Sequence, residues 1–199
     1  MNPAISFANL LLGNLSFAKF FIYVIAQNLG AFMAAVMVYL VYLFELESYE
    51  PGMHSLESAG IFTTFPNNLT TTTNTETFSL IWDQFIATML FVMSVLAICD
   101  DKNTKLPGTI KAVLVGLVLL IIGTSFGFNC GFPVNPARDF APRMFCLMAG
   151  WGDKVFTAGN YFFWVPVVMP MVGSVFGTIV YQLFISNHIP DEGLVERNF

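Results

Sequence analysis

Two copies of the tripeptide Asn-Pro-Ala could bring paired amide donors and two helix ends to one point. The copies begin Asn2-Pro3-Ala4 and Asn135-Pro136-Ala137, and the seven-residue segments that start there share five identities. Pro suits the first residue of a helix because its missing N–H would be unpaired there, and the preceding Asn can cap that helix. Two such helices facing each other would form a pore centre whose positive ends repel cations and protons.

The composition indicates a membrane protein. Only 11% of the 199 residues are charged, 56% are hydrophobic, and the net charge is −5. A soluble domain carries about 25% charged residues. The acidic balance without a basic stripe argues against a nucleic-acid partner. Cys99, Cys130 and Cys146 lack metal or redox spacing, and there is no nucleophile–base pair or phosphate loop. We therefore expect neither a cofactor nor an enzyme.

Four apolar runs are long enough to span a bilayer, at 17–44, 79–99, 106–128 and 161–186. Two shorter apolar pieces each follow an Asn-Pro-Ala, so we expect re-entrant half-helices within 1–16 and 129–150. Broken backbone is tolerated at membrane depth only where it lines a cavity or is buried in protein. The predicted fold is an all-α membrane bundle of four spans and two half-helices, built from inverted repeats. Small residues at four-residue spacing should let helices approach closely: Gly30 and Ala34, Gly123 and Gly127, Gly173 and Gly177.

Loop charges predict the orientation. The loop 45–78 contains several Glu residues and no Lys or Arg, whereas the turn after the second span holds Lys102 and Lys105. By the positive-inside rule this turn is cytoplasmic, the 45–78 loop is outside, and the tail 187–199 is cytoplasmic. Asn68, in Asn68-Leu69-Thr70, is a candidate glycosylation site in the outer loop.

The repeat also predicts a missing part. Two spans precede the second Asn-Pro-Ala, and none precedes the first. If the halves are inverted repeats, the chain corresponds to the last two-thirds of a six-span protein. A splice form, an internal start and an incomplete gene model are all open explanations.

Further motifs resemble the aquaporin, or major intrinsic protein, family and its aquaglyceroporin branch over residues 2–188. They are Ala26-Gln27-Asn28-Leu29-Gly30-Ala31-Phe32, Gly123-Thr124-Ser125, Gly127-Phe128-Asn129 and Val134-Asn135-Pro136-Ala137-Arg138-Asp139, with Arg143 four residues later. The resemblance implies passive passage of glycerol, water, urea and small polyols through a homotetramer in the plasma membrane.

The resemblance also implies a selectivity filter of Gly123, Phe132 and Arg138, and its fourth member, an aromatic residue, would lie on a span absent from this chain. Arg138 has fixed donors for two neighbouring hydroxyls, Phe132 offers a flat wall for C–H groups, and Gly123 widens the constriction. Alternatives are an interfacial Arg138, a Phe132 that only packs, and a Gly123 that serves a helix contact. We expect Asp139 and Arg143 to support the loop by ion pairing. Cys130 is either a target for mercurials or an inert buried thiol.

Three function classes remain after this reading. The first is a passive channel for glycerol and related small solutes. The alternative is a non-conducting isoform that modulates full-length subunits by co-assembly, because a pore without two of its spans is open to lipid. An active transporter is the third class, and the lack of an ionisable residue suited to ion coupling argues against it.

Overall fold

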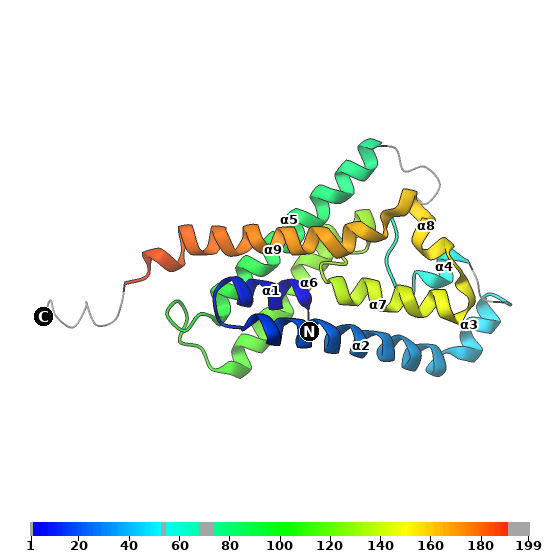
Figure 1. Ribbon diagram of the computed structural model, residues 1–199, viewed down its shortest axis with the longest axis horizontal. Coiled ribbons are helices and arrows are strands. Elements are labelled where there is room, and N and C mark those ends of the chain that lie inside the picture. Colours follow the sequence, from blue (N-terminus) through cyan, green and yellow to red (C-terminus); the bar gives the residue numbers. More distant parts are fainter. Residues whose placement is uncertain (1, 53–54, 68–73, 191–199) are drawn as a thin grey trace, which may run out of the picture.

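The computed structural model describes residues 2–52, 55–67 and 74–190, and these residues form helices joined by loops (Figure 1). The α-helices are α1 (Pro3–Leu11), α2 (Phe17–Val41), α3 (Leu43–Tyr49), α4 (Leu56–Ala59), α5 (Asn74–Cys99), α6 (Gly108–Cys130), α7 (Pro136–Cys146), α8 (Lys154–Tyr161) and α9 (Val165–Phe184). No strand occurs within the described ranges, and α2, α5, α6 and α9 lie in segments long and apolar enough to cross a membrane. The predicted all-α membrane class is confirmed.

The two short helices α1 and α7 lie between α9 and α2, with their N-terminal ends facing each other (Figure 1). Each packs against both long helices. Both begin with Pro directly after a capping Asn. Local sequence therefore starts the half-helices, and the long helices on either side hold them in line.

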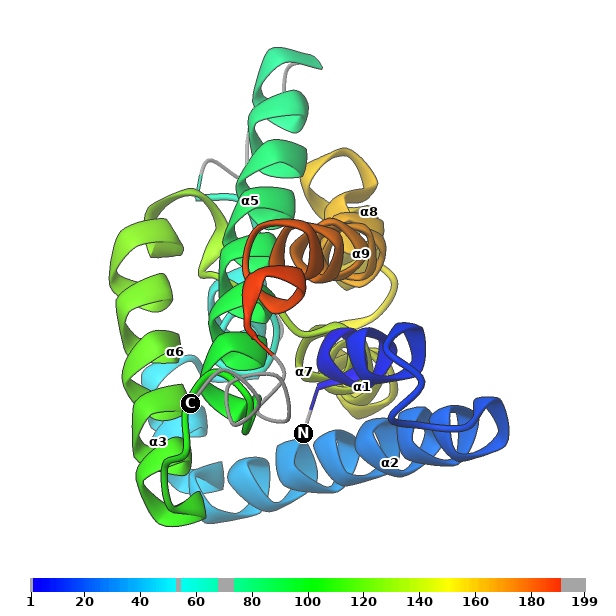
Figure 2. The ribbon, with the colours of Figure 1, turned by 90° about the vertical axis from the view of Figure 1, so that its left-hand side faces the viewer.

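The most extensive helix contact is that of α5 with α9, which cross in Figure 1 and lie side by side in Figure 2, where α9 is seen nearly end-on. A Cβ atom on Gly173 would lie 2.6 Å from the backbone oxygen of Phe85, and one on Gly177 would lie 2.6 Å from that of Met89. Only glycine permits this approach, as the four-residue spacing predicted. At Gly30, by contrast, an added Cβ would meet nothing within 4 Å.

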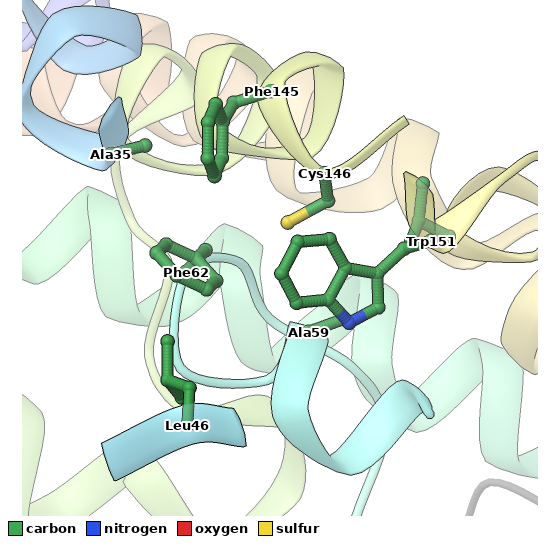
Figure 3. Packing of buried hydrophobic residues seen from close by; sticks show 8 residues of the cluster. Ala35, Leu46, Ala59, Phe62, Phe145, Cys146 and Trp151 are labelled. Atoms are coloured by element: carbon green, nitrogen blue, oxygen red, sulfur yellow. The ribbon is translucent and has the colours of Figure 1, made fainter. Parts of the chain in front are cut away.

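An aromatic cluster ties the loop predicted to lie outside, here called the outer loop, to the end of α7 (Figure 3). Phe62 from the loop packs against Phe145 of α7 and against Trp151. The indole Nε1 of Trp151 donates to Ser58 Oγ at 3.0 Å, so the ring is held by a hydrogen bond as well as by packing. This cluster fixes the path of the loop that approaches the candidate site.

Large apolar side chains cover the outward faces of α2 and α6. On α2 they include Ile25, Leu29 and Met33, and on α6 they include Val113 and Leu120, all more than half exposed. In water such a surface would be costly, whereas in hydrocarbon it has no such cost. The exterior therefore suits a lipid environment.

Candidate pore

Each Asn-Pro-Ala asparagine caps its own helix. Asn2 Oδ1 accepts a hydrogen bond from the N–H of Ala4 at 2.9 Å. Asn135 Oδ1 accepts from the N–H groups of Ala137 and Arg138, at 3.2 and 3.3 Å. Capping turns the amide oxygens toward the helices and leaves the amide nitrogens as donors at the point where the two helix ends face each other.

A hydrogen bond joins the first motif to the segment directly before the second. Asn2 Nδ2 donates to the carbonyl of Val134, the residue directly before the second motif, at 2.9 Å. Pro3, Ala4, Pro136 and Ala137 are buried. The prolines and alanines thus pack the half-helices into the protein, and the asparagines provide the polar groups.

A cavity of about 790 Å³ runs past both asparagines. Its lining residues are Asn2, Ile5, Ser6, Tyr23, Ala26, Gln27, Phe91, Val95, Val115, Leu119, Phe132, Pro133, Val134, Asn135 and Arg138. The polar members come from the asparagines of the two motifs and from α1, α2 and α7. In the described part of the chain, α5 and α6 contribute only apolar side chains to it. The cavity is therefore amphipathic: all its hydrogen-bonding side chains lie away from α5 and α6, and these two helices line it with hydrocarbon.

Sequence reasoning missed the apolar wall, although a signal for it exists. Phe91 and Val95 are four residues apart on α5, and Val115 and Leu119 are four apart on α6, so each pair shares one helix face. Many other apolar pairs in these helices have the same spacing. The pattern alone cannot show which face meets the cavity.

Arg138 lies half-buried at the cavity, where its Nη1 donates to the backbone carbonyl of Phe62 at 3.2 Å. This contact anchors the guanidinium to the outer loop, and its remaining N–H groups are donors that stay protonated. The guanidinium also borders a second cavity, lined in part by Thr64 and Gly131. Arg138 therefore stands between this second cavity and the 790 Å³ cavity.

The ring of Phe132 packs against α6 at Gly123. A Cβ atom on Gly123 would lie 3.0 Å from ring atoms Cε2 and Cζ of Phe132, and one on Gly127 would lie 3.5 Å from Cδ1. Gly123 is not itself among the residues that line the 790 Å³ cavity. It gives the Phe132 ring room to lie back against α6. Any effect of Gly123 on the cavity width therefore acts through that ring.

Asp139 and Arg143 form a buried ion pair one helical turn apart. Arg143 Nη2 lies 2.8 Å from Asp139 Oδ1, and both side chains are at most 1% exposed. Asp139 Oδ2 accepts from Thr63 Oγ1 at 3.0 Å and from the N–H of Thr64 at 2.9 Å. Arg143 Nη2 also donates to the carbonyl of Thr64, at 2.6 Å. The pair thus ties α7 to the same outer loop that anchors Arg138, and neither residue lines the inner cavity.

Asn68 lies outside the described residues. Over the ranges that the structure does describe, no group of three or more His, Cys, Asp or Glu side chains is arranged to hold a metal ion.

Known proteins match this chain over most of its length. The family model described as "Major intrinsic protein" matches residues 1–181. Aquaporin-10 of Homo sapiens is 40% identical over 195 residues, covering 96% of this chain and 63% of the relative. Aquaporin-9 of Mus musculus is 40% identical over 192 residues, covering 94% and 63%. The chain thus spans somewhat under two-thirds of these relatives' length.

A solved structure gives the same result at the level of the fold. The X-ray structure of the aquaglyceroporin from Plasmodium falciparum superposes with a TM-score of 0.82 and 29% identity, covering 94% of this chain and 73% of that one. The resemblance to the aquaglyceroporin branch is confirmed, and members of this family are channels rather than enzymes. The chain belongs to the major intrinsic protein family.

Proposed function

We propose that this chain forms the wall of a passive membrane pore for glycerol and related small polyols and urea, with water as a second permeant. One observation supports this most directly. The two capping asparagines, Phe132 and Arg138 border a single amphipathic cavity. The finer assignment to glycerol rests on the chemistry of that cavity and on the aquaglyceroporin resemblance.

A polyol has hydroxyls along one side and C–H groups along the other, which corresponds to the two walls of the cavity. Arg138 donates to hydroxyl oxygens at the outer end, and the amide nitrogens of Asn2 and Asn135 donate farther in. Phe91, Val95, Val115 and Leu119 receive the C–H side without demanding hydrogen bonds. The solute exchanges its water for these groups and leaves again without any covalent step.

The same groups oppose the passage of cations. Arg138 carries a fixed positive charge, and the N-terminal ends of α1 and α7 direct partial positive charge toward the asparagines. A cation that lost its hydration water here would find hydrogen-bond donors where it needs acceptors. Protons are disfavoured for the same electrostatic reason.

Glycerol uptake into liposomes carrying the purified 199-residue chain tests this proposal, with shrinking and reswelling followed by stopped-flow light scattering. The pore variant is Asn135→Asp, which places a negative charge at the cavity. Asn14→Asp, an identical change in the exposed turn after α1, is the matched control. We expect uptake above bare lipid that Asn135→Asp abolishes and Asn14→Asp preserves. Uptake equal to bare lipid for the unsubstituted chain would overturn the proposal.

The finer assembly and location are also proposals. The apolar outward faces of α2 and α6 are consistent with assembly in the bilayer, and the family resemblance implies a tetramer at the plasma membrane. Cross-linking in native membranes and surface biotinylation test these two points. Modulation of full-length subunits by co-assembly gains no support from the relatives.

A further inference from the structure

A buried polar network lies behind the loop 129–134, which takes in the last two residues of α6 and carries Phe132. Asp83 and Gln84 on α5 are 7% and 0% exposed. Asp83 Oδ1 accepts from Asn129 Nδ2 at 2.7 Å, and Asp83 Oδ2 accepts from Gln84 Nε2 at 2.8 Å. Within the described residues, neither member of this pair lines the 790 Å³ cavity. Contact with solute therefore does not explain why these two polar side chains are buried on α5.

The Asp83–Gln84 pair is hydrogen-bonded to both ends of the loop. At the beginning, Asp83 holds the Asn129 side chain. At the end, Gln84 Oε1 accepts from the N–H of Val134 at 3.0 Å. The carbonyl of Val134 in turn accepts from Asn2. Val134 therefore connects the loop to α5 through Gln84 and to the first half-helix through Asn2.

The loop backbone needs such support. Phe132 and Val134 have φ values of 42° and 35°, and neither is a glycine. Residues with side chains rarely adopt this region, least of all β-branched ones, and it persists only where surrounding contacts over-determine it. The contacts of the Asp83–Gln84 pair hold the loop at both ends of this strained segment.

We propose that Asp83 and Gln84 are a positioning pair that fixes the loop 129–134, and so sets how well the pore distinguishes glycerol from water. The selectivity part rests on the proposed function, because it acts through the position of the Phe132 ring. The positioning part does not depend on transport. The two parts can therefore be measured separately.

The pairing of donors and acceptors gives a sharp test. In Asp83→Asn the anion that accepts both bonds becomes a neutral amide, and its NH₂ group faces a donor unless the Asn129 amide also turns over. In the double variant Asp83→Asn with Gln84→Glu, the new amide nitrogen donates to the new carboxylate. That carboxylate still accepts from Val134, and the oxygen of the new amide still accepts from Asn129. The double exchange should therefore restore the loop.

Cys130 reports on the loop independently of transport. It is 1% exposed, and its Sγ lies 3.3 Å from Gln84 Nε2 and 3.6 Å from Asp83 Oδ2. The experiment follows the rate at which N-ethylmaleimide modifies Cys130, in a Cys99→Ser background because Cys99 is exposed. A Cys130→Ser chain gives the blank. Asp100→Asn, the same change at the residue directly after α5, is the matched control.

We expect Asp83→Asn to speed the modification of Cys130 several-fold and to lower the ratio of glycerol to water permeability. The double exchange should return both values to those of the parent, and Asp100→Asn should leave both unchanged. Parent-like labelling in Asp83→Asn, or an unprotected Cys130 in the double exchange, would overturn the inference. If Asp83→Asn fails to fold, the double exchange still decides the matter. If the unsubstituted chain carries no glycerol, the proposed function fails while the labelling still tests the positioning.

Discussion

At the scale of single residues, the candidate filter depends on a pair rather than on separate side chains. Gly123 is not among the cavity-lining residues, and it acts by leaving space for the Phe132 ring beside it. The guanidinium of Arg138 similarly depends on an oxygen of the outer loop. The filter residues therefore act through their neighbours as well as through their own chemistry.

Gly123→Ala should narrow the pore. The new Cβ would stand 3.0 Å from the Phe132 ring, which is tighter than ordinary contact, so the ring must move away from α6 toward the cavity. We expect glycerol permeability to fall several-fold, and water permeability to fall less because water is smaller. Gly116→Ala on the same helix, where a Cβ meets nothing within 4 Å, is the control. Stopped-flow measurement of both solutes checks this, and an equal loss for water and glycerol would contradict it.

At the scale of elements, a buried ion pair within α7 holds the outer loop through hydrogen bonds to Thr63 and Thr64. Asp139→Asn should lower the free energy of unfolding by about 3–5 kcal/mol, because it leaves the Arg143 guanidinium buried without its counter-charge. Thermal unfolding in detergent measures the effect. Asp101→Asn provides the comparison, since Asp101 is 88% exposed in its pair with Lys111 and such pairs contribute about 0–1 kcal/mol. Similar losses in the two variants would argue against the structural role of Asp139.

The contact between α5 and α9 supports a second prediction at this scale. Gly177→Ala places a Cβ 2.6 Å from the backbone oxygen of Met89, and no side-chain movement can relieve that clash. We expect a loss of about 1–3 kcal/mol, as for overpacking in a core. Gly30→Ala on α2, where the space is open, should change stability little. A larger loss of stability in Gly30→Ala than in Gly177→Ala would show that α5 and α9 are not packed as described.

How much of this could be read from the sequence depends on distance along the chain. Asn2 and Asn135 cap the helices that follow them, so local rules predicted both half-helices. Contacts between Thr63 and Asp139 join residues 76 apart, and no pattern in one sequence indicates them. Gly30 and Gly177 show the limit most clearly. Both sit in small-residue pairs at the same spacing, yet only Gly177 meets another helix backbone.

At the scale of the whole molecule, the charged loops predict which side faces the cytoplasm. The loop with Glu45 and Glu47 should be outside, and the turn with Lys102 and Lys105 inside. In the Cys99→Ser background, Glu47→Cys should react with a membrane-impermeant maleimide applied to intact cells. Lys105→Cys should react only after the cells are opened. Labelling of Lys105→Cys in intact cells would reverse the predicted orientation.

The anchor of Arg138 also bears on how this protein tolerates genetic change. Its acceptor is the main-chain oxygen of Phe62, which every amino acid supplies. Missense changes at codon 62 can disturb the aromatic cluster, but they cannot delete that oxygen. Insertions or deletions that alter the length of the loop would move it. Among natural variants, the length of this loop should therefore be preserved more strictly than the identity of residue 62.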